Sequence, residues 1–211
     1  MEKRKTTDLT DEEKKAKIKE RRRKTAKMAA FVREALDDFL KNASKGFTEE
    51  QYEKFIEEIE SEDRPVFVYE VTKKPYSLTL QIAVNENLIT FSCEYPYHCV
   101  NSAQMLNMLM HVNSANGLHE GFAYSHKNDN PIYERLFYFP KGWEENPEST
   151  KDFITYYFVM SKMSALAVAP SFENVVKKED EKFMKFLKGW GYKGDYMTPH
   201  TPSKGKSKYI N

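Results

Sequence analysis

The stretch PVFVYEVTKKPYSLTLQIAVNENLITFSCE, residues 65–94, decides the fold class because apolar and polar or small residues alternate along it. Every second residue of 78–84 is apolar, which is typical of a strand with one covered face. Asn-Glu-Asn at 85–87 provides a tight connection to another alternating run at 89–93. With a first strand at 65–71, this stretch predicts a three-stranded antiparallel meander.

The chain after the meander changes period twice. Asn101 or Ser102 is a suitable N-cap for an apolar helix that reaches about residue 115. After an Asn-Gly pair, alternation returns in predicted strands at 118–124 and 132–139, which a polar turn separates. A long aromatic-rich helix begins at Ser149, and Pro170 is expected to end it.

The chain before the meander predicts two helices. The first begins at an acidic turn after Thr10, is polar on every face at first, and ends by Gly46. The second covers 48–61 and begins with a capping signal, in which Thr48 is followed three residues later by Gln51. The apolar residues in the second half of the first helix recur at three and four residue spacing and require a docking surface: Met28, Phe31, Val32, Ala35, Leu36 and Phe39.

This element order, helix, three strands, helix, two strands, helix, predicts an α+β fold. We expect a five-stranded antiparallel sheet with helices packed on one face. Residues 1–46 form a basic, then amphipathic, helical extension, and residues 47–176 form the α+β domain. Residues 177–211 add a C-terminal helix and a basic tail that is too polar to form a core of its own.

Composition restricts the classes of function. A chain of 211 residues with 40% hydrophobic residues can build one core, and its mean hydropathy of −0.74 keeps part of it in water. The two cysteines are too few for a disulfide framework, and no stretch has the length and apolarity of a signal peptide or a membrane span. We therefore expect a cytoplasmic protein without membrane contact.

The helix predicted after residue 101 is the expected partner-binding element. Its apolar arc of about 200° is wider than the roughly 100° that one sheet covers. We expect a protein or peptide partner, or a second copy in a homodimer, to cover the excess, and three methionines suit an adaptable contact. The predicted contact residues are Met105, Leu106, Met108, Leu109, Met110 and Val112.

A basic run in the first helix gives the alternative function. Arg21, Arg22, Arg23 and Lys24 could neutralise the phosphates of a nucleic acid, together with the lysines of the tail. Residues 1–27 also carry 6 acidic residues beside 12 basic ones, and no aromatic stacking platform accompanies the arginines. These features favour interpreting the run as the solvated face of a charged helix.

Cys93, His98, Cys99 and His111 are the only candidates for chemistry. Thiolate and imidazole ligands suit zinc, but no CxxC or HxxxH spacing is present. A cysteine nucleophile would need a lowered pKa and an oriented base. Phosphate-binding loops, GxSxG and HExxH are absent from the sequence. We therefore expect neither an enzyme nor a bound cofactor or metal, with Cys93 as a small core residue.

The middle of the chain resembles the YbjN-domain family. The resemblance rests on Asn113 and Asn116, three residues apart, on Gly121 in the following strand, and on an aromatic-rich helix that ends in Ala-Pro-Ser-Phe at 169–172. It covers roughly residues 47–176. It implies a fold similar to the type III secretion chaperones and a non-enzymatic cytoplasmic binding protein, often dimeric. The family has no catalytic residues to carry over.

Overall fold

The computed structural model describes residues 10–43, 51–97, 105, 109–110, 113, 120–125, 130–139 and 142–189. The elements are α1 (Asp11–Ala43), β1 (Gln51–Ile59), β2 (Val66–Lys73), β3 (Tyr76–Asn85), β4 (Leu88–Glu94), β5 (Glu120–Ser125), β6 (Asn130–Tyr138), the short helix η2 (Trp143–Glu145) and α3 (Pro147–Gly189). Within these ranges, no helix combines the length and apolarity needed to cross a membrane.

The strands form one antiparallel sheet in the order β1-β2-β3-β4-β6-β5. The predicted α+β class and the meander of β2, β3 and β4 are confirmed. Alternation sets the register: Leu80 lies between Tyr69 on β2 and Cys93 on β4, and all three side chains are buried on the same face.

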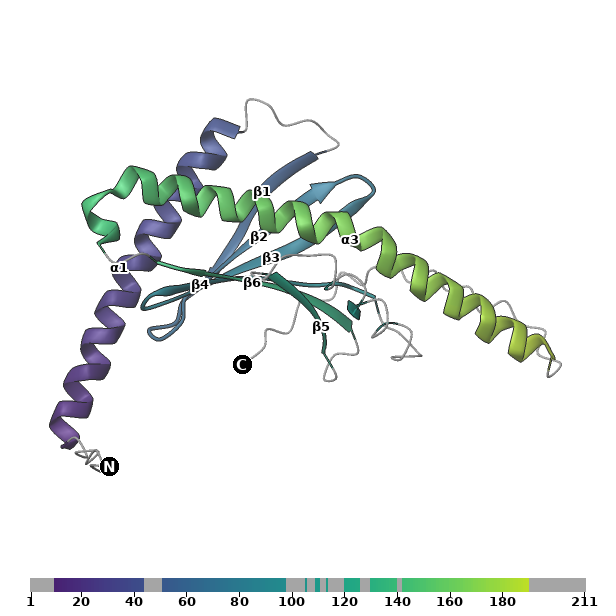
Figure 1. The fold of residues 1–211 in the computed structure, drawn as a ribbon, viewed down its shortest axis with the longest axis horizontal. Coiled ribbons are helices and arrows are strands. Elements are labelled where there is room, and N and C mark those ends of the chain that lie inside the picture. The colour runs from purple at the N-terminus through teal and green to yellow at the C-terminus, as the bar shows by residue number, and fades with distance from the viewer. Residues whose placement is uncertain are drawn as a thin grey trace, which may run out of the picture.

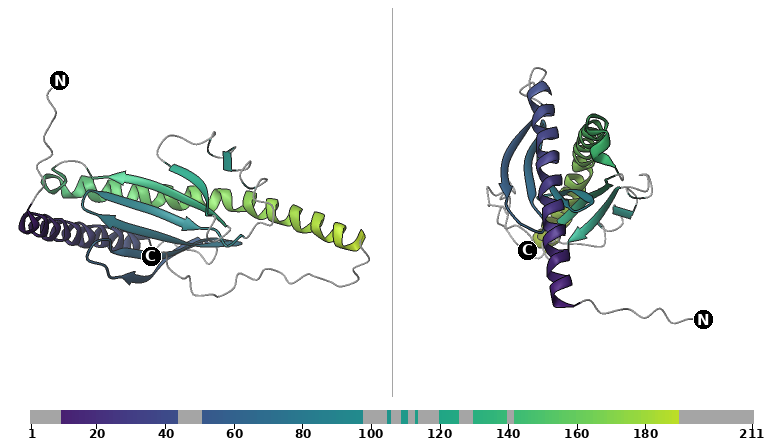
Figure 2. Two further views of the ribbon diagram at one scale, coloured as in Figure 1. Left: turned by 90° about the horizontal axis from the view of Figure 1, so that it is seen from below. Right: turned by 90° about the vertical axis from the view of Figure 1, so that its left-hand side faces the viewer.

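Both long helices cover the concave side of this curved sheet (Figures 1 and 2). Tyr69 of β2 contacts Phe158 of α3 with ring centroids 5.4 Å apart, and Phe39 of α1 contacts the same phenylalanine ring at 5.8 Å. Edge-to-face pairs of this kind add to the burial of the rings themselves. The sheet and the two helices therefore share one core.

Helix α1 begins with the expected acidic turn. The backbone N–H of Thr10 donates to Glu13 at 2.8 Å, and the N–H of Glu13 donates back to the Thr10 hydroxyl at 3.3 Å, which makes a capping box. Its polar first half projects beyond the sheet in Figure 1. In its second half, Met28, Val32 and Leu36 are buried in the common core, so the apolar stripe docks on the sheet and α3.

The second predicted helix, 48–61, is wrong where the chain is described, because residues 51–59 form strand β1. The sheet consequently has six strands and not five. The apolar residues of this strand lie on both of its faces, since Tyr52 pairs with Thr72 and Phe55 with Tyr69. They therefore do not alternate and instead recur at the spacing of a helix. Pairing with β2 along the whole strand outweighs the local capping signal.

The prediction that Pro170 ends the last helix is also wrong, because α3 continues through it to Gly189. Core contacts on both sides of the proline hold the helix together. The Tyr95 hydroxyl donates to the Ala165 carbonyl at 2.8 Å, and the Tyr95 ring contacts Phe172 at 4.7 Å. Residues 173–188 therefore continue α3 and do not form a separate C-terminal helix.

A buried ion pair joins the edge of the sheet to α3. Lys162 donates to Glu53 of β1, and both side chains are almost completely buried. Attraction in a low-dielectric interior offsets the cost of removing both charges from water only while both are present. The pair therefore fixes the position of the edge strand relative to α3.

We predict that Leu36→Ala destabilises the chain by about 2–5 kcal/mol, since truncating a buried leucine loses burial and leaves a cavity. Ile18→Ala in the exposed half of α1 is the control and should stay within about 0.5 kcal/mol of wild type. Urea unfolding followed by circular dichroism measures both. Equal, small effects would contradict the integration of α1 into the core.

We predict that Lys162→Met alone costs about 3–5 kcal/mol, because it leaves the Glu53 carboxylate buried without its partner. The double variant Glu53→Leu/Lys162→Met should recover most of that loss, since two apolar side chains require no compensation. The measurement is again urea unfolding. A double variant less stable than either single variant would contradict a compensating pair.

Candidate protein-binding groove

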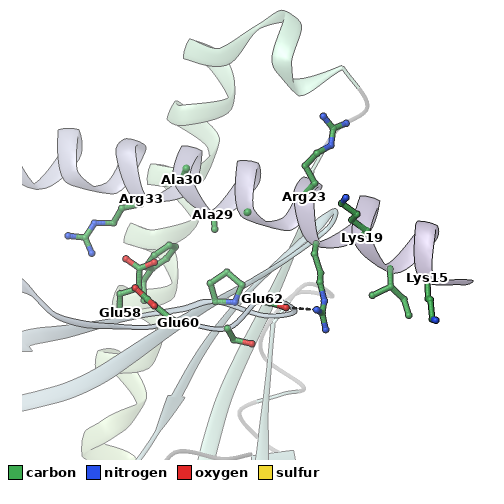
Figure 3. A pocket seen from close by; sticks show the side chains of 15 residues that line it. Lys15, Lys19, Arg23, Ala29, Ala30, Arg33, Glu58, Glu60 and Glu62 are labelled. Carbon is green, nitrogen blue, oxygen red and sulfur yellow. Dashed lines mark hydrogen bonds and ion pairs between the residues drawn. The ribbon is translucent and has the colours of Figure 1, made fainter. Parts of the chain in front are cut away.

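A groove of about 1110 Å³ lies between α1 and the far end of the β1–β2 hairpin (Figure 3). Its length follows α1 from Arg33 at one end to Lys15 at the other. The lining residues are Lys15, Ile18, Lys19, Arg22, Arg23, Ala26, Ala29, Ala30, Arg33, Glu58, Glu60, Ser61, Glu62, Pro65 and Phe67.

The middle of the groove is apolar, and only small side chains line it on the helix side. Ala26, Ala29 and Ala30 place three small side chains next to one another along α1. Pro65 and Phe67 lie opposite, and the exposed Ile18 extends the apolar surface towards the N-terminus of α1. Small residues on a helix allow another backbone to approach closely, so this surface can accommodate a polypeptide segment.

Charges of opposite sign line different parts of the groove. Lys15 and Lys19 lie on α1 at one end, and Glu58 and Glu60 lie on the hairpin side towards the Arg33 end in Figure 3. Within the part of the chain that the structure describes, none of these four residues makes an ion pair. All four residues are exposed, and charges that are not paired within the chain select ligands of complementary charge.

Two arginines that line the groove have charges that are already paired within the chain. Arg22 donates to Asp63 at 2.9 Å and to Glu62, and the hydrogen bond to Asp63 raises the pKa of the guanidinium. At the other end Arg33 stacks on the Phe55 ring, 3.4 Å from its centroid, and pairs with Asp37 at 2.9 Å. These contacts connect α1 to the hairpin at both ends.

Of the predicted nucleic-acid contacts, Arg22 and Arg23 line this groove and Arg21 and Lys24 do not, but each of the four has an acceptor within the chain. Arg21 donates to Asn85 at 3.2 Å, and Arg22 is paired as described above. Arg23 donates to Glu20 at 3.0 Å, and the ammonium of Lys24 lies 3.6 Å from Glu86. A phosphate would have to displace these acceptors.

The predicted partner-binding helix is described at only a few positions. Met105 and Leu109 are helical and buried in the core, whereas Met110 is helical and 71% exposed. Asn113 exchanges two 2.7 Å hydrogen bonds with the backbone of Phe122, which ties the end of this helix to β5. Leu106, Met108 and Val112 lie outside the described residues.

The candidate chemical residues do not meet in the described structure. Cys93 is only 1% exposed, and burial raises the pKa of its thiol, so it stays protonated. His98, Cys99 and His111 lie outside the described residues. Among the residues that are described, no three His, Cys, Asp or Glu side chains are grouped to hold a metal ion.

Comparison with known proteins adds no assignment: no family model, no curated protein and no solved structure matches the chain.

Sequence reasoning identified one wall of the groove and missed the other. The cations of α1 are visible as a basic run, but the helix predicted over 48–61 gives Glu58 no place beside them. In the structure Glu58 pairs across the ladder with Phe67, whose side chain faces the helices. The bulge between Phe55 and Glu57 produces this orientation. The only signal for this wall in the sequence was the spacing of the apolar residues of β1, and that spacing fits a helix as well as a bulged strand.

We predict that Cys93 reacts slowly with the thiol reagent DTNB in the native protein, measured in a Cys99→Ser variant. The reaction should be complete only after unfolding in urea. Raising the pH to about 9, where an ordinary thiol is largely thiolate, should leave the native rate far below the unfolded rate, since a raised pKa keeps the thiol protonated. Rapid native modification would contradict its burial.

Proposed function

We propose that this chain is a non-enzymatic protein-binding module that holds a segment of a partner polypeptide in the groove between α1 and the β1–β2 hairpin. The observation that carries the proposal is an apolar groove lined in different parts by lysines and by glutamates that make no ion pair in the described chain. The resemblance to the YbjN-domain family agrees with a binding role.

The charge balance of the groove favours a protein over a nucleic acid. Five cationic and three acidic side chains line it, so the formal sum is 5 − 3 = +2. Glu58 and Glu60 would repel the phosphates of a nucleic acid that filled the groove. A peptide would complement the groove with three kinds of residue. An apolar side chain would cover the floor, an acidic residue would pair with Lys15 and Lys19, and a basic residue would pair with the glutamates.

The substitution Ala26→Trp tests the groove directly. A phage-displayed library of random linear peptides serves as the probe, and the selected peptides are then measured by fluorescence anisotropy. Ala26→Trp should weaken them by about tenfold or more, which corresponds to 1.4 kcal/mol, because the indole occupies the floor. Ala16→Trp makes the same change at an exposed alanine of α1 outside the groove and should bind normally.

A charge reversal tests the recognition of the rim. Lys15→Glu/Lys19→Glu should weaken acidic peptides several-fold at low salt and should select basic peptides instead. Lys14→Glu/Lys17→Glu changes the net charge equally at two α1 positions that do not line the groove.

Two results would contradict this function. One is a library that yields no peptide sensitive to Ala26→Trp. The other is salt-sensitive binding of a DNA oligonucleotide that both charge reversals reduce equally, which would instead favour the nucleic-acid alternative.

A further inference from the structure

The outer face of α3 is an apolar surface that no described element covers. Between residues 153 and 172 the only charged side chain is Lys162, which points inward to Glu53. Phe153, Tyr156 and Met163 remain 52%, 57% and 56% exposed. Figure 1 shows α3 lying over α1 and the sheet, with no described element on its other side. Contiguous exposed apolar surface of this kind marks an interaction site.

Four exposed residues and the half-buried Met160 form a straight stripe. Phe153, Tyr156, Met160, Met163 and Ala167 follow one another at steps of three, four, three and four. This is the spacing by which one helix presents a continuous seam to a second helix. The stripe lies opposite the buried positions of α3, such as Phe158 and Ala165.

We propose that this seam packs against the same seam of a second copy, with the two α3 helices antiparallel. The two-fold axis passes between positions 161 and 162. In this register, Met160 meets Met163 of the other copy, Tyr156 meets Ala167 and Phe153 meets Pro170. Large side chains at the N-terminal end of the seam thereby meet small ones at its C-terminal end, so the face is complementary in shape to itself.

Charge supports the antiparallel direction. Exposed Glu148 precedes the seam, and exposed Lys177, which also pairs with Glu173 of its own helix at 2.6 Å, follows it. The antiparallel register places Glu148 of one copy opposite position 175 of the other, within two residues of Lys177, at both ends. A parallel arrangement would instead place Glu148 against Glu148 and Phe153 against Phe153. The seam itself carries no charge, so bringing two copies together buries none.

This association is separate from the groove and does not use the helical segment that includes Met110. Met163→Glu and Met110→Glu are therefore a matched pair, because each places a carboxylate at an exposed methionine. Light scattering coupled to gel filtration should give a dimer for wild type and for Met110→Glu, and a monomer for Met163→Glu. The melting temperature of Met163→Glu, extrapolated to low protein concentration, should match wild type.

A pair of engineered cysteines tests the direction. In a Cys99→Ser background, Tyr156→Cys/Ala167→Cys should form a disulfide-linked dimer on mild oxidation, whereas each single cysteine should not. A monomeric wild type, or a dimer that Met110→Glu disrupts and Met163→Glu does not, would overturn the proposal. Crosslinking by the single variants would overturn the antiparallel register.

Discussion

The ion pair between Lys162 of α3 and Glu53 of β1 couples the two layers of the molecule. Neither charge can be buried alone, so the edge strand and the helix hold one another in a single position. β1 also carries Glu58, and it leads into the end of the β1–β2 hairpin that forms the second wall of the groove. The same lysine is the only charge in the middle of α3, and its inward direction leaves the outer face of that helix uncharged.

The parts of the fold that could be predicted from the sequence are those in which one local period describes the whole element. β3 alternates without interruption because one face lies on the core and the other does not, and α1 shows its buried stripe only where it meets the sheet. Strand β1 could not be predicted, since its apolar residues lie on both faces and do not alternate. α3 could not be predicted past Pro170, because Tyr95 and Phe172 stabilise it through contacts distant in sequence.

Only one wall of the candidate site could be predicted from the sequence, for the same reason. A run of cations on a helix can be read directly from the sequence, but what they face depends on the strand that packs beside them. Arg22 and Lys24 reach Asp63 and Glu86, acceptors from two different connections of the sheet. These partners are distant in the chain, so no spacing rule could connect them to the basic run.

The cations of α1 divide into those that pair with other elements and those that make no ion pair in the described chain. Where the helix passes the sheet connections, Arg22, Lys24 and Lys27 pair with carboxylates on other elements and orient the helix. One turn and more before them, Lys15 and Lys19 line the groove without an ion pair in the described chain. Lysines that served only to keep α1 in contact with water would not require an apolar surface beside them. In the function that we propose, a partner segment would bury that floor and bring carboxylates to these lysines, so this end of α1 would gain most from binding.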